Sequence, residues 1–208
     1  MNNLRCTIYI VILIAFVGCA SGPSQLKANS IDVKNILTVY VETSPKLPTS
    51  FEYYSPESSH GAVIGGVIGS LIAQLASETD GASLESYVIN NNISLGQLYL
   101  DSFNRSILSS KKLQLTSDSN NDTKLSLEII EFGFIKGWGI SNVKPLIKVR
   151  AKLFNSKKVL WEETESISGW TSETASRPID EWLEDPVRFK KDIAYAFLFL
   201  SQLQLQSL

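Results

Sequence analysis

The sequence has few of the residues on which metal and nucleophile sites depend. It has one histidine, His60, and two cysteines among 208 residues. A single histidine excludes histidine-paired metal sites, and two cysteines exclude both a disulfide scaffold and a four-cysteine zinc site. The 19 basic and 21 acidic side chains give a formal charge of −2, and the basic ones form no long run. Binding to nucleic-acid phosphates is therefore not expected.

Motifs of common enzymes and cofactor sites are missing as well. The sequence contains no Gly-x-Ser-x-Gly elbow, no Walker loop and no Gly-x-Gly-x-x-Gly after an expected strand. We therefore predict no catalytic residue, no metal site, no cofactor and no enzymatic activity. One enzymatic alternative is left open, an enzyme of unrecognised type that uses Glu163 and Glu165.

These two glutamates also have a simpler interpretation. Side chains of a strand alternate between its faces, so Glu163 and Glu165 share a face and Glu162 points the other way. Lys148, Arg150 and Lys152 have the same alternation on an earlier strand. We expect a solvated strand face on which Glu163 and Glu165 form ion pairs with these cations.

The N-terminal residues are typical of an export signal. Arg5 is followed by an uncharged, mostly apolar run of 11 residues, 7–17. That run has the length of a signal-peptide core and is shorter than the about 20 residues that a transmembrane helix needs. We expect a signal peptide at 1–18, a flexible polar tether at 19–34, and a single domain at 35–208.

Residues 16–19, Phe-Val-Gly-Cys, resemble the lipobox of bacterial lipoprotein precursors, with phenylalanine in place of the usual leucine. The resemblance covers about the first 22 residues. It implies cleavage before Cys19, a diacylglyceryl thioether on its sulfur, and an acylated amino terminus, for example with palmitate. Several acyl chains together make a stable membrane anchor. Ala20 follows the cysteine where retained inner-membrane lipoproteins often carry aspartate, so the implied location is the outer membrane, facing the periplasm.

Hydrophobic periodicity predicts the fold of the remaining chain. The expected elements are a strand at 35–42, an irregular proline-containing loop at 43–59, a glycine-rich helix at 61–76, a helix at 94–112, a strand at 124–135, a loop at 136–145, hairpin strands at 146–154 and 159–168, and a last helix that begins at Asp185 after a polar loop. The strand at 124–135 changes phase near Ile129, which predicts a bulge. This order predicts an α+β fold with a mainly antiparallel sheet and helices packed on one face.

The order of elements is similar to that of the auxiliary lipoproteins of lipid-transporting ABC systems, over about residues 35–205. No shared motif carries this resemblance. It implies a bridging or docking role rather than catalysis, and it assigns no functional residue.

Two features of the mature chain are candidates for contacts with a partner or the membrane. Gly61, Gly65 and Gly69 stand four residues apart in an apolar run and would line one side of a helix, where another backbone can approach closely. Packing on the protein's own sheet is expected, with partner packing and membrane insertion as alternatives. Trp138 and Trp170 stand beside glycines in expected loops and could contact a partner or the membrane surface, or fold back on the core.

These observations predict a lipid-anchored envelope lipoprotein that binds or scaffolds within a cell-envelope assembly or transport system. The expected partners are the membrane, through the N-terminal lipid, and an envelope protein or a second copy of the chain. A lipid- or amphiphile-binding module, with an apolar cleft beneath the last helix, is an alternative.

Overall fold

The computed structural model describes residues 38–49, 51–54, 84–110, 112–136, 141–156, 158–168 and 174–208. The expected signal peptide, the tether and the glycine-rich helix at 61–76 lie outside the described residues. The elements are β1 (Thr38–Val41), β2 (Phe51–Tyr54), α4 (Leu84–Asn90), α5 (Leu95–Ser110), β3 (Gln114–Thr116), β4 (Thr123–Lys136), β5 (Asn142–Asn155), β6 (Lys158–Ile167), β7 (Arg177–Pro178), α6 (Ile179–Glu184) and α7 (Pro186–Gln206).

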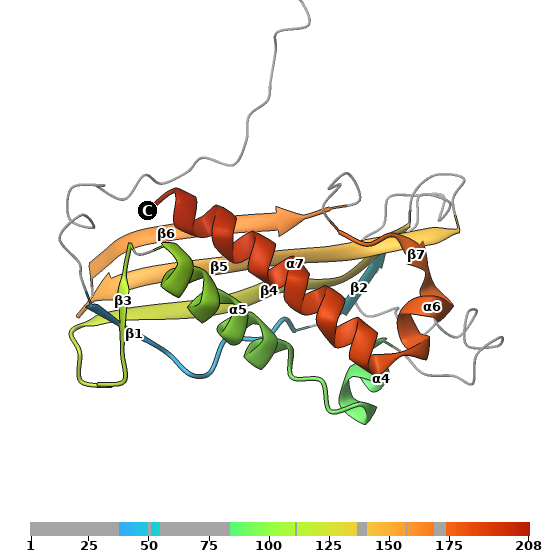
Figure 1. Ribbon diagram of the computed structural model, residues 1–208, viewed down its shortest axis with the longest axis horizontal. Helices are drawn as coiled ribbons and strands as arrows, with labels where there is room; N and C mark the ends of the chain where they lie inside the picture. Colours follow the sequence, from blue (N-terminus) through green and yellow to red (C-terminus); the bar gives the residue numbers. More distant parts are fainter. Residues whose placement is uncertain are drawn as a thin grey trace, which may run out of the picture.

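The expected α+β class is confirmed. One sheet has the order β3-β1-β4-β5-β6, and α5 and α7 lie side by side across one of its faces (Figure 1). The long strands β4, β5 and β6 are antiparallel, as expected. β1 pairs parallel with β3 and β4, and β2 pairs parallel with β4, so the whole sheet is mixed.

The predicted bulge in β4 is confirmed. The register with β5 shifts between Ile129 and Glu131. Leu127 before the shift and Phe132 and Phe134 after it are all fully buried, although their positions differ in parity. A one-residue slip turns side chains to the opposite face, so the bulge keeps both halves of β4 turned toward the core.

Both long helices follow their predicted patterns. Tyr99 and Phe103 of α5 are fully buried, and Ser94 accepts a hydrogen bond from the Gln97 backbone N–H at 3.3 Å. Asp185 caps α7 as expected, since its carboxylate accepts from the backbone N–H of Val187 at 2.9 Å. Of the helices in the described ranges, none is long and apolar enough to cross a membrane.

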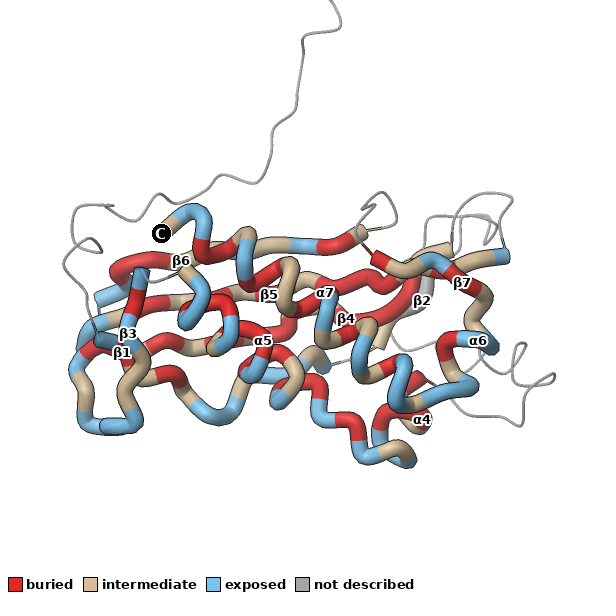
Figure 2. Tube along the Cα trace, in the orientation of Figure 1, coloured by how far each residue is buried: buried red, intermediate tan, exposed pale blue. Residues whose placement is uncertain are grey.

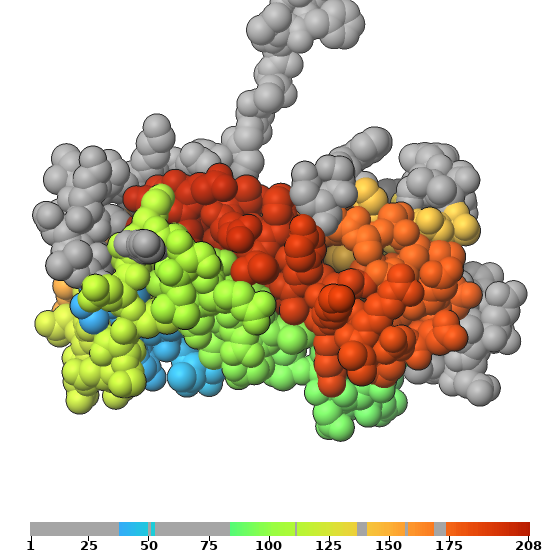
Figure 3. Space-filling model, in the orientation of Figure 1, coloured from blue at the N-terminus to red at the C-terminus, as the bar shows by residue number. Residues whose placement is uncertain are grey.

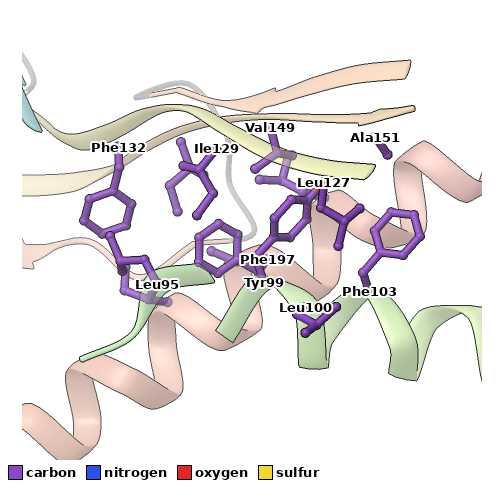
Figure 4. Close-up of a cluster of buried hydrophobic side chains, with 14 of the residues drawn as sticks. Leu95, Tyr99, Leu100, Phe103, Leu127, Ile129, Phe132, Val149, Ala151 and Phe197 are labelled. Carbon is purple, nitrogen blue, oxygen red and sulfur yellow. The ribbon is translucent and has the colours of Figure 1, made fainter. Parts of the chain in front are cut away.

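The core lies between α5, α7 and the sheet. Figure 2 shows that buried stretches follow the sides of the helices and strands that face one another, and Figure 4 shows the side chains that meet there. Tyr99 and Phe197 stack with ring centroids 5.2 Å apart. The Tyr99 hydroxyl donates to Gln204 Oε1 at 2.9 Å, so its polar end is satisfied inside the core.

Several expectations about short elements are wrong. β2 lies within the expected irregular loop, and α4 lies in the expected linker before residue 94. β5 begins at Asn142, and Pro145 belongs to it, opposite Phe134. Proline is tolerated there because Pro145 lies between the segments of β5 that pair with β7 and with β6.

The expectation of a polar loop before the last helix is also wrong. This segment holds the short helix α6, whose Trp182 is fully buried against Phe134, with ring centroids 5.0 Å apart. A buried ion pair lies beside this ring. Arg177 of β7 pairs with Asp192 of α7, and the guanidinium carbon of Arg177 lies 4.3 Å from the centroid of the Trp182 ring. The pair and the ring together connect β7, α6 and α7.

Candidate functional site

The predicted contact residues lie outside the described part of the chain and stay predictions: Cys19, Gly61, Gly65, Gly69, Trp138 and Trp170. Trp161 of β6 is buried. The described residues nevertheless contain the two glutamates that the sequence singled out, and the structure changes their interpretation.

The sheet face opposite the helices carries ion pairs of Arg150 and Lys152, whose carboxylate partners are Glu162 and Glu128. Arg150 Nη1 lies 3.4 Å from Glu162 Oε1, and Lys152 Nζ lies 3.3 Å from Glu162 Oε2. Arg150 Nε also lies 3.2 Å from Glu128 Oε2 on β4. These side chains are about a third exposed, so each pair contributes little to stability. The expectation that Glu163 and Glu165 make these pairs is wrong.

A bulge in the hairpin explains the error. Near the turn, Asn155 pairs with Lys158 and Phe154 with Val159, but Leu153 then pairs with Trp161. Leu160 is therefore an extra residue in β6. If the pairing continued from the turn without a bulge, Arg150 would lie opposite Glu163. With the extra residue Arg150 lies opposite Thr164, and Glu163 points to the other face of the sheet.

Glu163 and Glu165 lie on the face of the sheet that the helices cover. They pair with Ala151 and Val149, both fully buried, and directly opposite residues share a face. Both glutamates are half-buried. Burial raises the pKa of Glu165, and the nearby charge of Glu163 raises it further. The expectation of a solvated strand face is therefore also wrong.

Replacing Glu165 with glutamine should raise stability near neutral pH. Because the folded-state pKa of Glu165 is raised, the folded chain binds the proton more tightly than the unfolded chain does. Stability therefore falls as pH rises from the pKa of Glu165 in the unfolded chain to its pKa in the folded chain. We expect Glu165→Gln to raise the melting temperature at about pH 7 and to leave it nearly unchanged at about pH 3.5, where both states are protonated. An equal effect at both pH values would contradict this account.

β6 is also the longest edge strand of the described sheet. Within the described ranges it pairs with β5 alone, whereas the opposite edge strand, β3, has three residues. The outer edge of such a strand presents backbone N–H and C=O groups that can pair with another chain.

The helix α7 crosses the sheet obliquely, and its C-terminal end lies near β6 (Figure 1). Gln204 Nε2 donates to the Glu163 backbone carbonyl at 3.3 Å, and Trp161 Nε1 donates to Ser207 Oγ at 3.1 Å. These two bonds hold the C-terminal half of α7 at a fixed position along the edge strand.

The flank of α7 turned away from α5 is apolar near this edge. The Ala194 carbonyl faces α5, because it accepts from Ser102 Oγ at 3.1 Å. At about 100° per residue, Leu203 lies about 180° around the helix from Ala194, and Phe199 about 140° from it. Both side chains are half-buried. We call Glu163, Glu165, Phe199 and Leu203 the β6 margin.

The space-filling view shows how α7 and α5 cover the helix face of the molecule (Figure 3). In the described part of the chain, no group of three or more histidine, cysteine, aspartate or glutamate side chains could hold a metal ion. The β6 margin thus presents two carboxylates beside an apolar helix flank, along a strand edge that has no partner strand in the described part of the chain. The sequence alternation indicated that the two carboxylates share a face, but not which face.

Solved structures similar to this chain include proteins of three bacteria. Protein XCC0632 from Xanthomonas campestris, of family-model DUF330, is 16% identical with a TM-score of 0.44, over 83% of each chain. The hypothetical protein CT253 from Chlamydia trachomatis is 10% identical with a TM-score of 0.44, over 82% of this chain and 92% of that one. Lipoprotein GNA1162 from Neisseria meningitidis is 18% identical with a TM-score of 0.26, over 63% of this chain and 81% of that one.

The similar structures thus include a lipoprotein. No protein-family model matches the sequence, and no curated protein matches it. At these identities and TM-scores the similar structures assign neither a function nor a site to this chain.

Proposed function

We propose that this chain is a lipid-anchored lipoprotein of the bacterial outer membrane, facing the periplasm, whose domain binds a partner within an envelope assembly or transport system. The observation that carries the proposal is the Phe-Val-Gly-Cys run at 16–19, directly after an apolar segment of 11 residues. The lipid on Cys19 would hold the domain at the membrane, and the domain would make the contacts with the partner.

Features of the described domain support a binding role. Its long edge strand offers backbone groups to another chain, and the β6 margin places charge and apolar surface beside that edge. The alternative of an amphiphile beneath α7 has less support. The side of α7 that faces the sheet is filled by fully buried side chains, Ile193, Phe197 and Leu200. An amphiphile would have to displace them at a cost of several kcal/mol.

The anchor is tested by the intact mass of the protein extracted from membranes. We expect a chain that begins at Cys19 and carries the added mass of acyl chains. Cys19→Ala should abolish that added mass and prevent normal processing. Cys6→Ala is the matched control, because Cys6 lies in the segment expected to be removed, and the mature product should be unchanged.

An unmodified chain that retains residues 1–18 would contradict the anchor. The binding role is tested separately, by purification of the wild-type protein from its membranes in mild detergent. A partner that co-purifies in fixed proportion is expected, and recovery of the monomer alone would contradict the scaffolding part of the proposal.

A further inference from the structure

We infer that the β6 margin binds an extended segment of a partner protein that carries two basic side chains two residues apart. The segment would add to the sheet as a strand along the outer edge of β6, which has no partner strand within the described ranges. This inference rests on the proposed function only for the partner's place in the envelope, and it names the surface and the chemistry of the contact.

The pairing of β6 determines which side chains an added strand would meet. From Trp161 onward the register with β5 is regular. The side chains on the helix side are Trp161, Glu163, Glu165 and Ile167, and those on the other side are Glu162, Thr164 and Ser166. Residues directly opposite in neighbouring strands share a face. The two residues of the partner that lie opposite Glu163 and Glu165 would therefore be two apart and on the helix side.

The charges along the edge favour basic residues at these two positions. The segment 161–167 has three carboxylates and no basic residue. Glu162 is already paired, on the other face, with Arg150 and Lys152. Neither Glu163 nor Glu165 is among the ion pairs of the described residues, and the charge of Glu163 acts on Glu165. A cation opposite each carboxylate would replace this repulsion with attraction.

The apolar flank of α7 fits the same partner. Lysine and arginine have long aliphatic stems that cover apolar surface while the charged end reaches a polar group. Phe199 and Leu203 lie on the flank of α7 nearest the edge and stay half-buried. A basic side chain from an added strand could lay its stem along this flank and place its charge on Glu163 or Glu165.

A second copy of the chain fits this edge less well. In every antiparallel register of a β6–β6 pair that is centred between residues 162 and 164, at least one carboxylate among Glu162, Glu163 and Glu165 would stand directly opposite a carboxylate of the second copy. Like charges directly opposite in paired strands are destabilising. Charged side chains that point inward on an edge strand are also a common protection against indiscriminate pairing. The carboxylates thus disfavour self-association and favour a basic partner.

The test compares two labelled peptides on the full-length lipidated chain in mild detergent. Both peptides have the same background of alternating threonine and valine and differ at only two positions, which are two residues apart. One peptide has lysine at both of these positions, and the other has glutamate. Fluorescence polarisation should give a Kd for the lysine peptide at least about tenfold lower than for the glutamate peptide, and the difference should shrink at high salt.

Charge reversal tests whether the β6 margin is responsible. We expect Glu163→Lys with Glu165→Lys to reverse the preference, and Glu163→Gln with Glu165→Gln, which is less disturbing to the fold, to abolish it. The matched control is Glu181→Lys with Glu184→Lys, the same charge change at two exposed positions of α6. This control should keep the preference for lysine, and circular dichroism should show that every variant is folded.

Other outcomes would overturn the inference. Equal Kd values for the two peptides would overturn it, as would a preference that survives in the glutamine variant. Self-association of the wild-type chain in sedimentation, changed by the Glu163 and Glu165 variants, would make a second copy the occupant instead. Peptide binding does not depend on Cys19, so Cys19→Ala should bind the lysine peptide equally. A failure of the anchor and a failure of this site are therefore distinguishable.

Discussion

Asp192→Ala is expected to lower the free energy of unfolding by about 3 kcal/mol or more, because it leaves a buried guanidinium without its counter-charge. The Arg177 side chain is 8% exposed and that of Asp192 is 24% exposed. Arg177 Nη1 already has no hydrogen-bond partner. Without the carboxylate, the Trp182 ring would not neutralise the charge, and the contact between β7, α6 and α7 should loosen.

Urea unfolding monitored by tryptophan fluorescence measures this effect. Asp180→Ala is the matched control, since Asp180 is exposed on α6 and its removal should change stability by less than about 0.5 kcal/mol. The double variant Arg177→Met with Asp192→Leu should recover most of the loss, because neither partner then leaves an uncompensated charge. A loss below about 1 kcal/mol for Asp192→Ala would show that the ion pair is not buried in solution as described.

Gly133→Ala should be comparably damaging, for a steric reason. A Cβ added at Gly133 would lie 1.8 Å from the Glu52 backbone oxygen and 2.6 Å from its carbonyl carbon. Backbone atoms of a paired strand cannot rotate away as a side chain can, so β2 would have to separate from β4. That separation would also break the edge-to-face contact of Phe51 with Phe132, whose ring centroids are 5.5 Å apart. We expect a loss of about 3 kcal/mol, from strain and from exposure of Phe51.

Hydrogen exchange locates this effect, because the amides of Phe51–Tyr54 should lose protection before those of the centre of β4. Gly96→Ala is the control. A Cβ there would lie 3.4 Å from the flexible end of the Leu47 side chain, and alanine favours the helix by about 1 kcal/mol over glycine. Its stability should be unchanged or increased. If Gly133→Ala were equally neutral, the close approach of β2 to β4 would be wrong.

Much of the fold could be predicted because some elements are long and locally well marked. α5 has apolar residues at helical spacing, and α7 begins with a capping carboxylate followed by proline. The phase change in β4 indicated its bulge, since only a bulge keeps both halves facing one core. The short elements were missed because their stability comes from tertiary contacts. β2 has four residues and pairs with β4, far away in sequence, and α6 has six and is held by the burial of Trp182.

Residues close together in the chain are sufficient to recognise the class of the domain, the β5–β6 hairpin and the lipobox-like pattern on which the proposed anchor rests. The face that Glu163 and Glu165 occupy is known only from the packed fold, because the one extra residue at Leu160 reverses the alternation beyond it. The packed fold also brings Arg177 to Asp192, with the guanidinium against the Trp182 ring, and leaves β6 at the end of the described sheet. Such pairings depend on how strands and helices that are distant in the chain pack together, and the local hydrophobic pattern of a segment does not predict that packing.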